Sequence, residues 1–107
     1  MKKLILAGWL AAVMSVGSAT AQDYNADIAN ACGGEGGCIT WMTRIIGCES
    51  QWDPSAWHPN PYGGADVGLL QIHDATWGDI AYAGGTSQIY WAADMYRAGM
   101  SGEWVCQ

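Results

Sequence analysis

The sequence predicts a small, mainly helical domain of the α+β class that is held together by disulfide bonds. Three observations lead to this prediction. Apolar residues recur at helical spacing in several short stretches of the chain. Between these stretches, residues 50–64 contain three prolines and several turn-forming residues, which predict an ordered loop without regular elements. Four cysteines in a chain of 107 residues predict two disulfides, and this length allows one domain.

The start of the chain, residues 1–21, predicts an export signal. Lys2 and Lys3 precede an apolar run of 13 residues, and the small-x-small sequence at residues 19–21 supplies a cleavage site. This run is shorter than the roughly 20 residues that cross a membrane. We therefore expect a soluble, secreted or periplasmic domain of residues 22–107, with an uncleaved membrane anchor as the alternative.

The charge of the expected mature domain limits its partners. Arg44 and Arg97 stand against ten acidic residues and give a net charge of −8. Nucleic acid is excluded as a partner because it requires a basic surface, and an anionic membrane is disfavoured for the same reason. A neutral or carbohydrate ligand remains open, and a monomer is expected. No cofactor or metal is expected, since His58 and His73 lack ligand spacing to each other or to the cysteines.

All four cysteines follow the expected cleavage site: Cys32, Cys38, Cys48 and Cys106. A small exported domain buries little surface, so two disulfides are its expected state. Three pairings are possible. We favour Cys32 with Cys38, which closes a glycine-rich turn, and Cys48 with Cys106, which ties the middle of the chain to its end.

Two helices are expected before the loop. Residues 23–30 predict a short helix with Ile28 as its main apolar anchor. Residues 38–49 predict a longer one, because apolar residues recur there at helical spacing. These residues are Ile39, Met42, Ile45 and Ile46.

Beyond the loop, residues 67–72 form a short apolar run that fits either a buried strand or the beginning of a helix. Asp74 is expected to be the N-cap of a helix over residues 75–82. A last helix is expected from about residue 86 to Gly99, with one apolar face. That face contains Ile89, Ala92, Ala93 and Tyr96. The tail is expected to pack back on the domain if its cysteine is bonded.

Glu49 is the first candidate for a catalytic residue. It stands three residues beyond Ile46, on the apolar face of the expected helix and in its last turn. Burial and the negative end of the helix dipole both favour the protonated carboxyl. Glycosidases use such a carboxyl as a proton donor. The alternative is an ordinary helix-end residue that reaches solvent or pairs with Arg44 or Arg97.

An ordered set of short motifs accompanies Glu49 along the chain. These motifs are Cys48-Glu49-Ser50, Tyr62-Gly63-Gly64, Gly68-Leu69-Leu70-Gln71-Ile72, Thr76-Trp77 and Trp104-Val105-Cys106. Together they resemble the lysozyme-like superfamily, and within it the small lytic transglycosylase (SLT-like) domains and the resuscitation-promoting factor domains. The resemblance covers residues 38–106, and it depends on the order of the whole set rather than on any single motif.

The resemblance implies a small two-lobed helical domain, with the irregular or β-like segment lining a cleft between the lobes. It also implies cleavage of the β-1,4 bond between N-acetylmuramic acid and N-acetylglucosamine, with peptidoglycan glycan strands as the partner. The catalytic acid of the family corresponds to Glu49, and Ser50 corresponds to a serine that supports it. Gly68, Leu69 and Gln71 correspond to a turn that faces the acid, where Gln71 hydrogen-bonds sugar or holds the site.

Asp66 separates two mechanisms within the superfamily. It stands two residues before Gly68, where animal-type lysozymes have a second carboxylate. A retaining hydrolase needs the two carboxyl groups about 5–5.5 Å apart. A lytic transglycosylase needs one, since its acid protonates the leaving oxygen and then activates the C6 hydroxyl of the sugar to give a 1,6-anhydro product. Asp is also common in turns. We predict the single-acid mechanism, in which Asp66 supports the loop.

The aromatic residues divide into two groups. Trp41 and Trp91 lie at helical positions and are expected in the core. Trp57 and Tyr62 lie in the loop near Glu49, where they either stack on sugar rings or only fill the surface.

Two other classes of function fit the residues. A catalytically silent carbohydrate-binding domain would keep Trp57, Tyr62 and Gln71 for sugar contacts, but the match at Glu49 argues against it. A small disulfide-stapled interaction protein is supported only by the acidic charge and the number of aromatic residues.

Overall fold

The computed structural model describes residues 21–106, which form four α-helices, three short strands and one 3-10 helix. The elements are α1 (Ala21–Ala31), α2 (Gly36–Ser50), β1 (Trp57–Pro59), β2 (Ala65–Val67), β3 (Ile72–His73), α3 (Asp74–Ala81), α4 (Gly85–Arg97) and η1 (Ser101–Glu103). The predicted α+β class is confirmed, and all four expected helices are present with slightly different ends. The predicted export signal lies outside the described residues, except for its last position at Ala21.

The three strands form an antiparallel sheet in the order β1-β2-β3. Pro59 pairs with Ala65 between β1 and β2, and Val67 pairs with Ile72 between β2 and β3. The prediction that residues 50–64 contain no regular element is wrong, because β1 lies within them. Proline is tolerated there because β1 is an edge strand, where a missing backbone donor does not interrupt a ladder on both sides.

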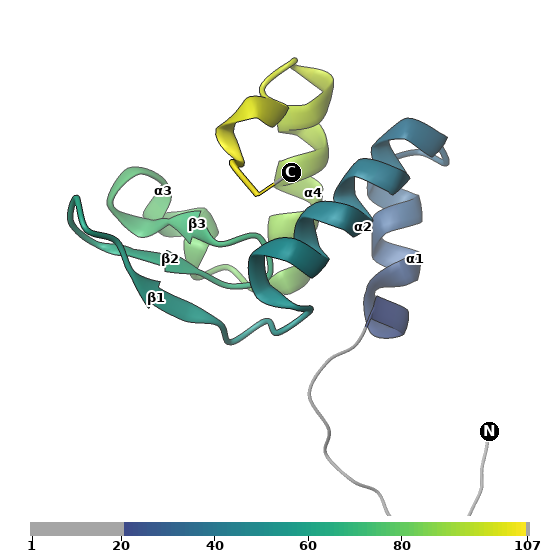
Figure 1. Cartoon of the computed structure of the whole chain (residues 1–107). Helices are drawn as coiled ribbons and strands as arrows, with labels where there is room; N and C mark the ends of the chain where they lie inside the picture. The colour runs from purple at the N-terminus through teal and green to yellow at the C-terminus, as the bar shows by residue number, and fades with distance from the viewer. Residues whose placement is uncertain (1–20, 107) are drawn as a thin grey trace, which may run out of the picture.

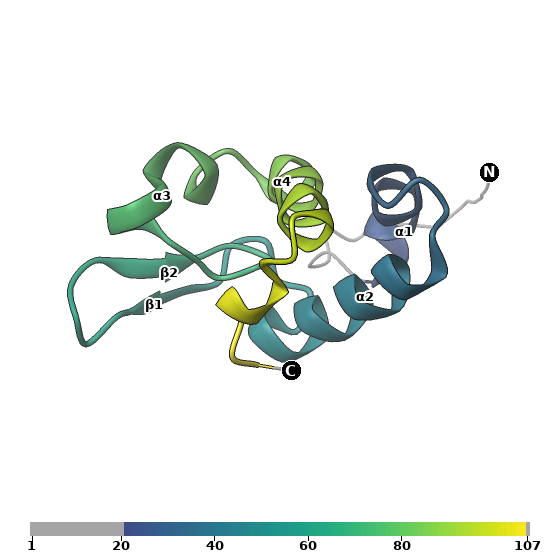
Figure 2. The ribbon, with the colours of Figure 1, turned by 90° about the horizontal axis from the view of Figure 1, so that it is seen from above.

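The sheet and α3 lie at one side of the molecule, and α1 and α2 lie at the other (Figure 1). Helix α4 lies between these two parts, as the view from above also shows (Figure 2), and it contacts α1, α2 and α3. The C-terminal segment returns from α4 to the end of α2, where Cys106 is bonded to Cys48. This arrangement places the end of α2 beside the sheet.

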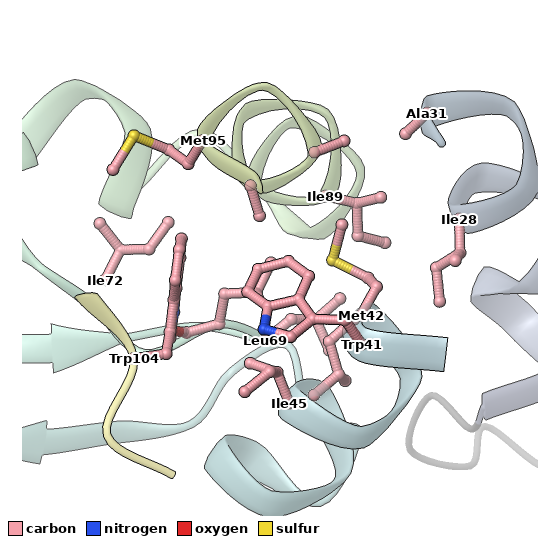
Figure 3. Packing of buried hydrophobic residues seen from close by; sticks show 14 of the residues in the cluster. Ile28, Ala31, Trp41, Met42, Ile45, Leu69, Ile72, Ile89, Met95 and Trp104 are labelled. Carbon is pink, nitrogen blue, oxygen red and sulfur yellow. The ribbon is translucent and has the colours of Figure 1, made fainter. Parts of the chain in front are cut away.

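The core joins both parts of the domain (Figure 3). Met42, Ile45 and Ile46 of α2 are completely buried, as are Leu69 and Ile89. The predicted apolar faces of α2 and α4 are thus confirmed. Each side chain of this kind contributes about 1.5–3 kcal/mol when it is fully buried, so the helix spacing seen in the sequence accounts for much of the packing.

The C-terminal tail is part of this core. Trp104 is buried, and its indole N–H donates a hydrogen bond to the carbonyl oxygen of Leu70 at 2.8 Å. The ring of Trp104 also contacts those of Trp41 and Trp91, with centroids 5.3 and 5.9 Å apart. The prediction that the tail packs back on the domain is confirmed.

Helices α2 and α3 begin in different ways. Glu35 caps α2, because its carboxylate accepts hydrogen bonds from the backbone N–H groups of Gly37 and Cys38, both at 2.8 Å. The prediction that Asp74 caps the following helix is wrong. Asp74 is the first residue of α3, and β3 runs directly into this helix. Its carboxylate instead accepts from the Tyr82 hydroxyl (2.7 Å) and the Ala65 backbone N–H (2.8 Å), and these bonds lower its pKa.

Gln88 of α4 is a buried polar residue that holds the turn between β2 and β3. Its amide oxygen accepts from the backbone N–H of Leu70, and its amide nitrogen donates to the carbonyl oxygens of Val67 and Ala81, all at 2.9 Å. Gly68 has a φ of +83°, and a Cβ atom there would collide with the Gln88 amide. The apolar run at residues 67–72 is thus the end of β2, this turn and the beginning of β3.

Replacing Gln88 by leucine should destabilise the domain by about 3 kcal/mol, because three buried backbone groups would lose their partners at once. Urea unfolding followed by circular dichroism measures this change. Ser87→Ala, an exposed change on the same helix, is the control and should have a small effect. A Gln88→Leu protein as stable as this control would contradict the role that we give to the amide.

Both predicted disulfides are confirmed. Cys32 is bonded to Cys38 and Cys48 to Cys106, with Cα atoms 5.6 and 5.9 Å apart. Disulfides of this kind are typical of proteins that fold in an oxidising compartment. Among residues 21–106, no helix is long and apolar enough to cross a membrane.

Candidate active site

A cleft of about 380 Å³ lies where α2, the sheet, α3, α4 and the C-terminal segment meet. Glu49 contributes from α2, Asp66 from β2 and His73 from β3. Trp77 contributes from α3 and Trp91 from α4. The cleft therefore combines segments that are distant in the sequence, and it exists only in the folded domain.

Glu49 is half-buried in the cleft wall, in the last turn of α2. Burial is the main cause that raises the pKa of its carboxyl group. A hydrogen bond from the backbone of Cys106 acts in the opposite direction, and the nearby negative charge of Asp66 raises the pKa further. The net effect is a raised pKa, which extends the protonated, proton-donating form to higher pH.

Arg97, one of the two arginines proposed as alternative partners of Glu49, is engaged elsewhere. Arg97 donates to a carboxylate oxygen of Asp94 at 2.6 Å and to the carbonyl oxygen of Ala31 at 2.9 Å. Asp94 lies three residues before it on the exposed side of α4. An arginine beside Glu49 would lower its pKa, so the engagement of Arg97 with other groups is compatible with the raised value.

Asp66 lines the same cleft and is held from two sides. The side-chain amide of Asn60 donates to its carboxylate at 3.2 Å, and Nδ1 of His73 donates at 3.3 Å. Asn60 belongs to the β1–β2 connection and His73 to β3, so Asp66 ties these segments together. These contacts fit the predicted loop-supporting role. Asp66 is also a second carboxylate in the cleft, in addition to Glu49.

Backbone strain is concentrated beside the cleft. Three non-glycine residues among residues 21–106 have positive φ: Gln51 (53°), Trp52 (67°) and Gln71 (49°). The first two directly follow the end of α2, and Gln71 lines the cleft itself. Each such residue costs on the order of 1–3 kcal/mol, and strain of this kind clusters at functional sites.

Gln71 holds the site together through its side chain. Its amide nitrogen donates to the carbonyl oxygens of Gly68 (3.0 Å) and Ala56 (3.3 Å). Its amide oxygen accepts a hydrogen bond from Nδ1 of His58 at 2.7 Å. These contacts tie His58 of β1 to the turn at Gly68, and they fit the expectation that Gln71 holds the site.

Three other predicted site residues, Leu69, Gly68 and Ser50, are buried. Leu69 belongs to the predicted turn, but its side chain is completely buried in the core and does not line the cleft. Gly68 is buried next to Gln88, which explains why it must be glycine. Ser50 is buried, and its hydroxyl donates to the carbonyl oxygen of Ile46 at 3.2 Å, so it supports the end of α2.

The structure confirms only some of the locations that were predicted for the aromatic residues. Trp41 is buried, as expected. Trp91 packs against the core and also lines the cleft, so its predicted core position is confirmed in part. Trp57 lies in β1 and lines a second hollow that also contains Glu49. Tyr62 lies in the turn after β1 and is 95% exposed, away from the lining of the cleft.

Trp77, His73 and Asn60 were not predicted to belong to the site. Trp77 interrupts the regular dihedral angles of α3 (φ −131°, ψ 50°), and its ring lies 5.2 Å from that of Trp91. The motif Thr76-Trp77 was a signal for this residue. The pairing of His73 and Asn60 with Asp66 left no mark in the sequence, because it depends on the register of the sheet.

Comparisons of the chain with protein-family models, curated proteins and solved structures found no match. In the described part of the chain, no group of three or more His, Cys, Asp or Glu side chains is placed to hold a metal ion.

Proposed function

We propose that this protein is an exported enzyme that cleaves the β-1,4 bonds of peptidoglycan glycan strands, with Glu49 as the proton donor. The observation that carries this proposal is a half-buried carboxyl with a raised pKa in the wall of an open cleft. Such a carboxyl remains protonated at a pH where exposed carboxyl groups are ionised, as general acid catalysis of glycoside cleavage requires. Clearing of a suspension of purified cell wall tests the activity directly.

The proposal includes a lysozyme-like arrangement and a localisation. The helices α1 and α2 would form one lobe, and the sheet with α3 would form the other, with the glycan strand in the cleft between them. Secretion or export to the periplasm is supported by the two disulfides and by the motif at residues 19–21. A monomer without a cofactor suffices, because one carboxyl group supplies the chemistry.

We propose lytic transglycosylation as the mechanism. Glu49 would donate its proton to the leaving glycosidic oxygen as the bond from that oxygen to the anomeric carbon breaks. The carboxylate would then take the proton of the C6 hydroxyl, whose oxygen attacks the same anomeric carbon and closes the 1,6-anhydro ring. The hydrogen bonds of Asp66 to Asn60 and His73 support a positioning role for that residue.

A hydrolytic lysozyme is the second candidate, and one observation favours it: Asp66 lines the same cleft as Glu49 and influences its pKa. In that mechanism Asp66 would form a covalent glycosyl intermediate, which water then releases. A silent glycan-binding domain or an interaction protein would clear no cell wall at all, so the turbidity assay separates both from the enzymes.

Asp66→Asn should reduce activity less than Glu49→Gln does, because asparagine keeps the shape and some of the hydrogen bonds of a positioning residue. Mass spectrometry of the released muropeptides reports the mechanism independently. Transglycosylation leaves the summed mass of the two products equal to that of the substrate, whereas hydrolysis adds one water. Products that contain the added water, together with an Asp66→Asn protein as inactive as Glu49→Gln, would establish the two-carboxylate hydrolase instead.

The pH dependence should follow the titration of Glu49. Activity should fall as the pH rises through the raised pKa of Glu49, because the proton donor is then lost. Asp66→Asn removes a negative charge that opposes ionisation, so it should lower the pKa of Glu49. NMR titration of the Glu49 carboxyl carbon in both proteins measures this shift, even in a variant without activity. An unchanged or higher pKa would contradict the coupling between these carboxyl groups.

A further inference from the structure

The only two histidines of the chain flank Asp66 in the sheet. His58 of β1 and His73 of β3 are both directly opposite Asp66 in the register of the strands, which lie side by side (Figure 1). Directly opposite residues of antiparallel strands have their side chains on the same face of the sheet. The two histidines and Asp66 therefore form a row across the three strands. The neighbours of Asp66 in β2, Ala65 and Val67, are on the other face and are buried.

The two histidines of this row have different partners. Nδ1 of His73 donates to Oδ1 of Asp66 at 3.3 Å. Nδ1 of His58 instead donates to the amide oxygen of Gln71 at 2.7 Å. The amide nitrogen of Gln71 is used for two backbone carbonyl groups, so its oxygen is the atom that faces His58. The row thus contains one histidine that holds Asp66 and one that holds a different residue, which makes His58 a matched comparison for His73.

Both carboxylate oxygens of Asp66 accept hydrogen bonds. Besides the bond from His73, Oδ1 accepts from the side-chain amide of Asn60 at 3.2 Å, and Oδ2 accepts from the same amide at 3.4 Å. These donors belong to β3 and to the β1–β2 connection. The side chains of His73 and Asp66 are 27% and 33% exposed, and both residues line the cleft. The carboxylate is thus held by the sheet and its hairpin at a place that a ligand in the cleft can reach.

These bonds bear on which oxygen atom attacks the anomeric carbon. In a retaining hydrolase, a carboxylate oxygen of Asp66 would attack that carbon while Glu49 protonates the leaving oxygen. Glu49 would then take a proton from water, whose oxygen displaces Asp66 from the carbon. A carboxylate that accepts hydrogen bonds is a weaker nucleophile, because its lone pairs are engaged and it must leave its donors to reach the sugar. The C6 hydroxyl of the sugar then has the advantage as the attacking group.

We propose that His73 is a positioning residue that determines the product of the reaction, because its hydrogen bond keeps Asp66 from attacking the sugar. This inference rests on the proposed function, since it takes Glu49 as the proton donor. Loss of the bond should allow Asp66 to act as the nucleophile, and part of the product should then contain an added water. His73 therefore selects the 1,6-anhydro product over the hydrated one.

The first experiment measures the ratio of hydrated to 1,6-anhydro ends, by mass spectrometry of muropeptides released from purified cell wall. His73→Phe keeps a ring but has no N–H, and it should raise this ratio about tenfold, the effect of one hydrogen bond to a charged group. His73→Asn should stay close to the wild-type ratio, because its amide nitrogen is near the position of Nδ1 and can still donate. His58→Phe is the matched control and should leave the ratio unchanged, whatever its overall rate.

A double variant tests whether the added water enters through Asp66. Adding Asp66→Asn to His73→Phe should return the ratio to the wild-type value, because an amide does not form the glycosyl intermediate. An unchanged ratio in His73→Phe would overturn the proposal, and so would a raised ratio that persists without the Asp66 carboxylate. Hydrated ends as the main product of the wild-type protein would overturn it as well.

The second experiment measures the hydrogen bond itself and requires no activity and no substitution at His73. The partner of one ring nitrogen sets where a neutral histidine carries its proton. The nitrogen NMR spectrum of the neutral His73 ring should therefore show the proton on Nδ1, and Asp66→Ala should abolish this preference. A proton on Nε2 in the wild-type protein would overturn the proposal. Failure of the proposed function would appear separately, as cell wall that the wild-type protein does not clear or that the Glu49→Gln protein clears.

Discussion

Replacing Glu49 by glutamine should reduce glycan cleavage at least about 100-fold, the low end of what a general acid contributes. Glutamine has nearly the same size, and its amide oxygen can keep the hydrogen bond from the Cys106 backbone. It has no acidic proton that it could transfer to the leaving group. Clearing of purified cell wall and product analysis by chromatography measure the loss. Asp79→Asn, which removes an exposed carboxylate of α3 outside the cleft, is the control and should retain full activity.

The stability of the Glu49→Gln protein supplies a second readout. A carboxyl whose pKa is raised by folding stabilises the domain only at low pH, and this contribution disappears as the pH rises through the raised value. At neutral pH the half-buried anion is therefore unfavourable, and Glu49→Gln should unfold at the same or a slightly higher temperature. A variant that keeps near wild-type clearing would refute the proposed function, whatever its stability.

Removing the disulfide between Cys48 and Cys106 should have the largest effect on stability. The bond joins residues 58 positions apart, and a loop of this length contributes about 4 kcal/mol in the chain-entropy description. This is a large part of the roughly 5–15 kcal/mol that stabilises a typical small domain. The double substitution Cys48→Ala and Cys106→Ala should therefore unfold at much lower urea concentration, as followed by circular dichroism.

The same substitution should also disturb the site, because Cys48 precedes Glu49 and the backbone of Cys106 hydrogen-bonds to its carboxylate. The control removes the other disulfide, Cys32 with Cys38, whose six-residue separation contributes only about 2 kcal/mol and which lies at the opposite end of α2. If both double variants lost equal stability and equal activity, the long disulfide would have no special role in holding Glu49.

Much of the helical framework could be predicted from local patterns. The apolar residues of α2 and α4 recur every three or four positions, and the structure buries them together. The disulfide pairing could be predicted because one pair closes a short glycine-rich turn and the other joins distant segments. The position of Glu49 on the apolar face of α2 followed from the same periodicity, since a helix places residues three and seven positions apart on one side.

Other features were decided only by the tertiary structure. Strand β1 forms in a proline-containing stretch because β2 offers it an edge, and Asp74 bonds to Ala65 and Tyr82 instead of capping α3. The groups around Asp66 likewise combine separate segments. A local pattern determines which face of a segment is apolar, but it does not determine which other segment that face meets. For this reason the sequence by itself identified the helices, the disulfides and Glu49, whereas the rest of the cleft depended on how α3, α4 and the sheet pack against one another.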